Sequence, residues 1–146
     1  LIVIERSTKV TEVLKEGVGL SAKVSSELIQ NIFMPRTPLH DGAIVIDKNQ
    51  ILAAKCILPL ASEISVPKNL GTRHRAAVGI TEISDALVVV VSEETGIISL
   101  VESGKLTRNL TGDELKALLI EKLDRTQNRK AMKNMKKGKD TQEAQK

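Results

Sequence analysis

The residues best suited to chemistry in this sequence form one short stretch, Gly71-Thr72-Arg73-His74-Arg75. It stands directly before Ala76-Ala77-Val78, the first apolar residues of a predicted helix. The start of a helix has unpaired backbone N–H groups and carries the positive end of the helix dipole. Two arginines at that end cost electrostatic energy unless an anion lies over them, so the stretch predicts a phosphate site. The alternative is a surface helix whose arginines bind no ligand.

A second polar cluster, His40-Asp41-Gly42-Ala43, follows a loop framed by Pro35 and Pro38. A carboxylate beside a histidine can hold a divalent cation, and a glycine lets a ligand approach the backbone. The cluster therefore suits a metal–phosphate site. An ordinary Asp-Gly turn explains the same residues equally well.

A third cluster, Ser92-Glu93-Glu94, ends the apolar run from Leu87 to Val91. Adjacent acids at such a place usually form a solvated turn, but they can also attract a cation or a basic partner. Both histidines of the chain fall inside these clusters, which favours proton or metal chemistry over packing. Acid, arginine and histidine together suggest phosphoryl or nucleotidyl transfer. The glycine patterns of P-loops and dinucleotide-binding folds are absent from the sequence.

The composition is that of one soluble globular domain. The 146 residues are 41% hydrophobic and 27% charged, enough for a single core. One Phe and no Tyr or Trp leave few side chains on which nucleic-acid bases could stack, so no nucleic-acid partner is expected. The single cysteine, Cys56, excludes an internal disulfide and fits a reducing compartment; its apolar neighbours predict a buried thiol.

The net charge of +4 hides two unlike segments. Residues 125–146 hold eight basic and two acidic residues, whereas residues 1–124 are slightly acidic. We expect 125–146 to be a basic, disordered tail; contact with lipid or nucleic acid is the alternative. The chain has no apolar run near the ~20 residues that cross a bilayer. It starts without methionine inside a predicted strand, so we expect an N-terminally truncated piece of a longer protein.

The elements that must position these clusters follow from periodicity and turn residues. Strands are expected at 1–5, 44–46, 51–58, 87–91, 97–101 and 106–109, the second and third joined as a hairpin, as are the last two. Residues 7–23 are expected to be loop with a short strand at 18–20. Ser25 or Ser26 caps a helix that ends before Pro35, and a helix from Thr72 fades by Ser84. Thr111 and Glu114 form a capping box for a last helix.

In order and spacing, these motifs resemble the signature of the diadenylate cyclase (DAC, DisA_N) domain. The resembling motifs are Asp41-Gly42-Ala43, Gly71-Thr72-Arg73-His74-Arg75-Ala76-Ala77 and Ser92-Glu93-Glu94-Thr95-Gly96. The segments Thr37-Pro38-Leu39-His40 and Leu58-Pro59-Leu60 are similar to the membrane-anchored CdaA (DacA) type. The resemblance implies an α/β (α+β) fold, a single domain over residues 1–124 with a twisted mixed central sheet flanked by helices.

The same resemblance implies an enzyme that condenses two ATP into cyclic di-AMP and two pyrophosphates. Two protomers would meet face to face as a homodimer, with Mg²⁺ or Mn²⁺ held by Asp41 and His40. The implied catalytic residues are Asp41, Gly42, Ala43, Arg73, His74 and Arg75. The implied ATP-binding residues are Gly42, Leu58, Gly71, Thr72, Arg73, His74, Arg75, Ser92, Glu93 and Glu94. The anchored type implies upstream membrane helices, a catalytic domain on the cytoplasmic face and regulatory protein partners.

One position departs from the family pattern. Members of this type commonly carry an aromatic residue before the Leu-Pro-Leu segment, where it can pack on adenine, and this chain has Ile57 there. An aliphatic side chain covers a base without the added stacking contribution, so weaker purine binding is expected. The alternative function is a non-catalytic adenine-nucleotide-binding regulatory module, and a third is a nucleic-acid arm formed by the tail.

Overall fold

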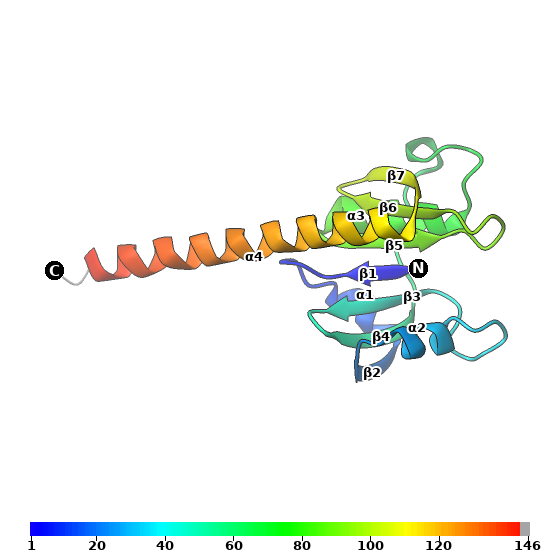
Figure 1. The fold of residues 1–146 in the computed structure, drawn as a ribbon, viewed down its shortest axis with the longest axis horizontal. Coiled ribbons are helices and arrows are strands. Elements are labelled where there is room, and N and C mark those ends of the chain that lie inside the picture. The colour runs from blue at the N-terminus through cyan, green and yellow to red at the C-terminus, as the bar shows by residue number, and fades with distance from the viewer. Residues whose placement is uncertain (144–146) are drawn as a thin grey trace. The chain divides into compact units, whose positions relative to one another are not determined.

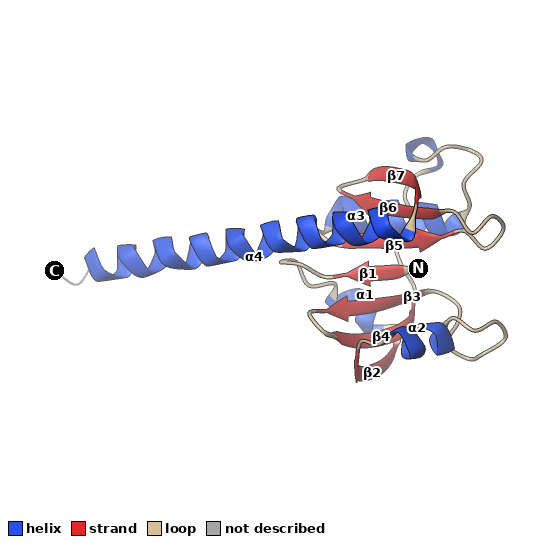
Figure 2. Ribbon diagram, in the orientation of Figure 1, coloured by secondary structure: helices blue, strands red, loops and turns tan. Residues whose placement is uncertain are grey.

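A mixed seven-stranded sheet forms the body of the chain (Figures 1 and 2). This computed structural model describes residues 1–143, and their side chains except at positions 64 and 135–143. The strands lie in the order β2-β4-β3-β1-β5-β6-β7. Their bounds are β1 Ile2–Ile4, β2 Val18–Lys23, β3 Ala43–Asp47, β4 Gln50–Cys56, β5 Leu87–Val91, β6 Ile98–Glu102 and β7 Lys105–Leu110. β1 runs parallel to β3 and antiparallel to β5, which confirms the predicted mixed sheet.

Both faces of the sheet are buried by helices because the central strands are apolar on both sides. Val3 and Val45 belong to a core cluster shared with α1 (Thr11–Lys15) and α3 (Thr72–Ile83). Their neighbours Ile44 and Ile46 belong to a second cluster, packed against α2 (Ser26–Ile32). Alternate residues of a strand point to opposite faces, so one apolar run supplies both clusters. The prediction that the apolar strands are interior is therefore confirmed.

The structure confirms the predicted helices α2 and α3. The Ser25 hydroxyl accepts a hydrogen bond from the backbone N–H of Leu28 at 3.1 Å, as an N-cap should. α3 begins at Thr72 and ends at Ile83, next to the predicted end at Ser84. The predicted hairpin between β6 and β7 is confirmed, with Ser103 and Gly104 both at positive φ (50° and 74°) in its turn.

The expectation of loop over residues 7–23 is wrong in part. α1 is a single helical turn whose Val13 is buried, and β2 continues to Lys23 through an irregularity after Gly19. α1 escapes sequence analysis because five residues carry little helical preference of their own. Its start is held instead by a side-chain contact just before the helix, in which the backbone N–H of Val10 donates to the Glu5 carboxylate at 2.8 Å.

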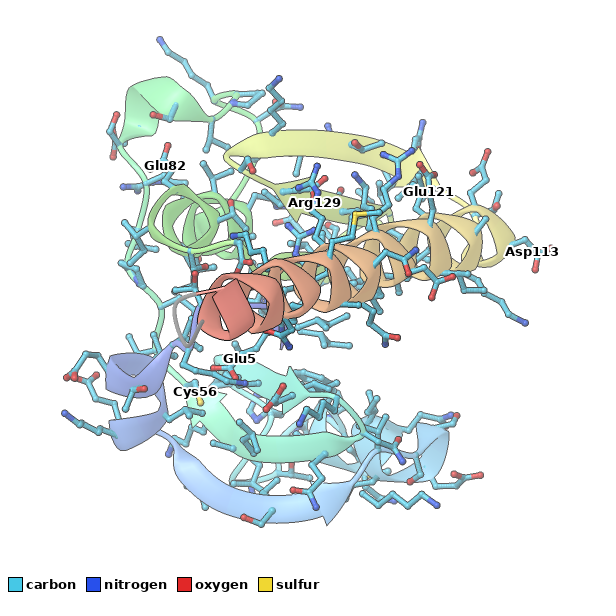
Figure 3. The ribbon with its side chains drawn as sticks, turned by 90° about the vertical axis from the view of Figure 1, so that its left-hand side faces the viewer. Glu5, Cys56, Glu82, Asp113, Glu121 and Arg129 are labelled. Carbon is cyan, nitrogen blue, oxygen red and sulfur yellow. The ribbon has the colours of Figure 1, made fainter. Side chains whose placement is uncertain are left out.

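The segment predicted to be a basic, disordered tail is drawn mostly as helix in this structure. The last helix, α4, runs without a break from Gly112 to Glu143, so most of the predicted tail is helical; residues 144–146 lie outside the described residues. It contains no proline and is rich in helix-forming residues, and Arg125 pairs with Glu121 one turn earlier at 2.6 Å. Asp113, Glu121 and Arg129 mark its course in Figure 3.

The predicted domain ends at residue 124. The chain forms two compact units, Leu1–Thr111 and Gly112–Lys146, so position 124 falls inside α4. A short 3₁₀ turn, η1 (Glu63–Ser65), lies in the polar connection before α3. Among the described residues, no helix combines the length and apolar character needed to span a membrane.

Candidate active site

The Gly71–Arg75 motif begins α3, and nothing in the helix itself neutralises that end. Gly71 is the N-cap, with extended backbone and no side-chain cap bond, and the first turn contains no acid. The backbone N–H groups of the first turn are therefore available to a ligand, together with the positive end of the dipole. An anion bound here would satisfy both.

A cleft of about 700 Å³ opens at this helix start, and we call it the α3 cleft. Three segments line it: the residues around the start of α3, the turn between β5 and β6, and one residue of β7. The lining residues are Lys68, Asn69, Leu70, Gly71, Thr72, Arg73, His74, Ser92, Glu93, Glu94, Thr95, Ile97 and Arg108. The cleft thus brings together two of the three predicted clusters.

Arg73 is the residue that connects the α3 cleft with its surroundings. It also lines a hollow of about 290 Å³ with Asp41, Gly42 and Leu58, and another of about 430 Å³ with His40. All three predicted clusters therefore converge on the Arg73 side chain. Its guanidinium is held by Glu93 through two contacts of 2.7 Å, Nη1 to Oε2 and Nη2 to Oε1. This fork-like pair fixes the position of Arg73.

Arg75 is not brought into the α3 cleft. Its Nε and Nη2 donate to the carbonyl oxygen of Ala61 at 3.2 and 3.1 Å, and Nη1 lies 3.6 Å from Glu63 Oε1. The backbone N–H of Ala61 in turn donates to the Arg75 carbonyl at 3.0 Å. In this structure Arg75 fastens the connection before α3 to the helix.

His74 lines the α3 cleft but is only 5% exposed. Its Nε2 has no hydrogen-bond partner among the described residues, which is costly for a buried polar atom. Burial lowers the pKa of His74 below its ordinary value of 6.5, and the nearby positive charge of Arg108 lowers it further. The imidazole is therefore neutral at pH 7, with one ring nitrogen left for a ligand or water.

His40 and Asp41 are in contact with each other through their side chains. The Nδ1 of His40 lies 2.7 Å from the Thr37 carbonyl, which can only accept, so Nδ1 carries the proton. The other ring nitrogen, Nε2, lies 3.4 Å from Asp41 Oδ1, so one cation could contact both atoms. Within residues 1–143 no group of three or more metal-binding side chains occurs. Two donors fit Mg²⁺ or Mn²⁺ only if phosphate and water oxygens complete the shell.

The glycine beside Asp41 is required by the backbone. Gly42 has φ +82°, and a Cβ atom there would lie 2.7 Å from the Cys56 carbonyl oxygen. Its neighbour Ala43 is fully buried in β3 and pairs with Cys56, so Ala43 supports the site from the core. Cys56, labelled in Figure 3, is buried as predicted, and burial raises the pKa of its thiol to about 11.

The third predicted cluster forms a tight turn. The Ser92 hydroxyl accepts from the backbone N–H of Thr95 at 3.3 Å, and the Gly96 N–H donates to the Ser92 carbonyl at 2.9 Å. Ile57 is 67% exposed and Leu58 is buried, and both line the hollow with Asp41. Sequence analysis missed Lys68 and Arg108. In the sequence they are only a basic residue on a loop and a basic residue on a strand. Nothing else distinguishes them from the other lysines and arginines.

The family model described as "DAC: DisA bacterial checkpoint controller nucleotide-binding" matches residues 1–106. The cyclic di-AMP synthase CdaA of Bacillus subtilis is 53% identical over 119 residues, and a diadenylate cyclase of Listeria monocytogenes is 48% identical over 123. These alignments cover 82% and 84% of this chain but only 44% and 45% of the relatives. The chain thus spans less than half the length of these two relatives.

Solved structures agree with the fold. A double mutant of DacA from Staphylococcus aureus superposes with a TM-score of 0.80 at 45% identity, covering 84% of this chain and 81% of that one. A structure described as a hypothetical membrane spanning protein from Bacillus cereus gives 0.72 at 44% identity, covering 75% and 54%.

Proposed function

Because this chain belongs to the diadenylate cyclase (DAC) family, we propose that it condenses two ATP into cyclic di-AMP and two pyrophosphates. The observation that supports this activity best is the convergence of all three polar clusters on Arg73. The helix start, the Asp41 carboxylate and the apolar side chains beside it thereby lie around one arginine. The names of the relatives favour the same reaction, and the CdaA type in particular.

The triphosphate binds at the start of α3. The open N–H groups after Gly71, the Thr72 hydroxyl and the Arg73 guanidinium lie on the wall of the α3 cleft, and Ser92 lies opposite. Neutral His74, in the tautomer with the proton on Nε2, offers that unpaired N–H to the phosphate. Such fixed donors stabilise the charge that develops on the phosphate during transfer. Arg75 acts indirectly, by holding the connection that precedes the helix.

The adenine lies over the apolar part of the adjoining hollow. Leu58 and the exposed Ile57 form that part, next to Gly42, whose missing side chain allows close approach. Ile57 supplies apolar cover without the stacking of an aromatic ring.

Asp41 and His40 would hold Mg²⁺ or Mn²⁺, and the Asp41 carboxylate favours loss of the proton of the attacking 3′-hydroxyl to water. The cation, when bound, offsets phosphate charge. The 3′-oxygen forms a bond to the α-phosphorus of the other ATP as the bond to the leaving pyrophosphate breaks. Asp41 is well placed for this work because its side chain is 72% exposed. Glu93, and Glu94 beside it, contribute by orienting Arg73 or by meeting the cation.

A second copy of the chain supplies the other ATP. One protomer carries one helix start and one Asp41, so it binds one nucleotide, and each 3′-hydroxyl must meet an α-phosphate held by the partner. The reaction therefore takes place between two face-to-face protomers. In the longer protein, we propose that upstream membrane helices hold this domain at the cytoplasmic face, where regulatory proteins reach it.

Mass spectrometry of the products formed from ATP with Mn²⁺ or Mg²⁺ tests the activity. The wild type should yield cyclic di-AMP and pyrophosphate, whereas Asp41→Asn should yield neither while still binding ATP. Asp124→Asn, an exposed change on α4, is the matched control and should keep activity. Tight ATP binding without product in either metal would instead support a non-catalytic nucleotide-binding module.

A further inference from the structure

The two arginines of the helix motif are already engaged in the absence of ligand. Arg73 is held by both carboxylate oxygens of Glu93, and Arg75 by the Ala61 carbonyl and Glu63. A bound triphosphate carries several negative charges beyond the α-phosphate. Its full neutralisation in the α3 cleft calls for cations that are not already paired.

Two such cations line the same cleft, Lys68 on the connection before α3 and Arg108 on β7. Within the described part of the chain, neither side chain forms an ion pair or a hydrogen bond. Arg108 is exposed, so it reaches the cleft without the cost of a buried unpaired charge. The guanidinium of arginine suits phosphate because it donates two hydrogen bonds in one plane.

The position of Arg108 relative to the helix start is supported by His74. Arg108 and His74 both line the α3 cleft, and the positive charge of Arg108 helps to lower the pKa of the His74 imidazole. Nε2 of His74 is buried and has no partner among the described residues. A phosphate between Arg108 and the start of α3 would meet an unpaired cation and, in the tautomer with the proton on Nε2, an N–H donor of His74.

We propose that Arg108, assisted by Lys68, binds the β- and γ-phosphates of ATP and thereby selects triphosphate over monophosphate nucleotides. This assignment rests on the proposed function for the identity of the ligand. It also gives Arg108 a role in the reaction, since the β- and γ-phosphates leave together as pyrophosphate and their charge must be balanced as the bond breaks. Through Arg108, β7 thus contributes to the ATP site, whereas the three sequence motifs lie only on α3 and on two turns.

Calorimetric titration of Arg108→Gln with ATP, AMP and inorganic pyrophosphate tests the proposal. The variant should bind ATP and pyrophosphate about tenfold or more weakly, because a charge-assisted contact is lost, and AMP as tightly as the wild type. Arg108→Lys should recover part of the loss. Lys105→Gln, an exposed change on the same strand outside the cleft, is the matched control and should leave all three affinities unchanged.

Two results would overturn the assignment. Unchanged ATP and pyrophosphate affinities in Arg108→Gln would show that Arg108 does not meet these phosphates. An equal loss for AMP would indicate a general structural role. Product analysis separates this proposal from the proposed cyclase activity. If Arg108→Gln binds ATP and pyrophosphate like the wild type and makes cyclic di-AMP, only the role of Arg108 is rejected. If binding depends on Arg108 but the wild type makes no product, only the cyclase activity is rejected. A wild type that binds neither ATP nor pyrophosphate rejects both.

Discussion

At the scale of single residues, the ion pair between Arg73 and Glu93 decides how the site receives its substrate. Arg73 lines all three hollows, yet in this structure its guanidinium is already satisfied by Glu93. A phosphate therefore competes with a carboxylate for Arg73, and a cation that binds Glu93 would release Arg73 toward the phosphate.

Glu93→Gln should consequently bind ATP more tightly than the wild type when no divalent metal is present, by about two- to tenfold. The neutral amide no longer holds the guanidinium, and one repelling charge leaves the cleft. The advantage should shrink at saturating Mg²⁺. Equilibrium dialysis in chelator and in Mg²⁺ measures both affinities, and weaker metal-free binding by the variant would contradict this account. Glu94→Gln, one position along the same turn, controls for the charge alone.

Gly42→Ala should destabilise the fold by about 1–3 kcal/mol, because it places a side chain at φ +82° with its Cβ 2.7 Å from the Cys56 carbonyl oxygen. Nucleotide affinity should fall as well, since the strand end that presents Asp41 must shift. Urea denaturation measures the first effect. Gly19→Ala meets nothing within 4 Å and should change stability little. Equal stability of the two variants would contradict the strain argument.

The pH dependence of stability tests the state of His74. Burial and the charge of Arg108 lower its pKa in the folded protein, so the unfolded chain takes up the proton first as the pH falls. The stabilisation that depends on neutral His74 is complete above pH 6.5. Below this pH the free energy of unfolding falls by up to about 1.4 kcal/mol per pH unit. His74→Leu should show a smaller loss of unfolding free energy between pH 8 and pH 5. An identical slope would show that His74 is not buried in its neutral form.

At the scale of elements, α3 positions the site because it packs tightly on the Leu58-Pro59-Leu60 segment. A Cβ atom at Gly79 would lie 2.1 Å from the Pro59 carbonyl oxygen and 2.8 Å from the Ala61 N–H nitrogen. The absent side chain lets the helix and that segment meet. The helix start with Arg73 and the base-covering Leu58 are thereby fixed relative to each other.

Gly79→Ala should therefore destabilise the protein by about 1–3 kcal/mol or more, although alanine is the better helix former by about 1 kcal/mol. Denaturant unfolding measures the change in the free energy of unfolding. A decrease shows that the packing clash outweighs the higher helix propensity of alanine, and an increase shows the reverse. Glu82→Ala, at an exposed position of the same helix (labelled in Figure 3), should stay within about 0.5 kcal/mol of the wild type. A stabilised Gly79→Ala protein would show that α3 does not require close contact there.

Much of this arrangement could be predicted from the sequence, and the failures share a cause. β5 and α3 were predicted because their own residues suffice, an apolar β-branched run in one and a helix start with regular apolar spacing in the other. α1 was missed because it is a single turn whose start depends on a side-chain contact with Glu5. A contact of this kind leaves no signal in helical periodicity or preference.

The same limit applies to the site. The motif residues Arg73, Ser92 and Glu93 were predicted and do meet in one cleft. Arg75 was predicted beside them, but its bond to Ala61 depends on how the preceding connection folds back. Arg108 was not predicted, since β6 and its turn separate it in sequence from the cleft residue Ile97, and only the pairing of β7 with β6 brings it back.

At the scale of the whole molecule, one chain provides half of the proposed reaction centre. A single Asp41 and a single α3 start can hold one ATP, whereas the product contains two adenylates. Everything proposed for catalysis therefore depends on a second copy, even though each residue of the binding site comes from one chain.

The initial rate of cyclic di-AMP formation per mole of protein, measured against protein concentration at saturating ATP and metal, tests this claim most directly. The account predicts a specific activity that rises with concentration over about three decades and levels off when dimers saturate. A specific activity that stays constant down to concentrations where light scattering shows only monomers would contradict it, because a single chain would then be making the product alone.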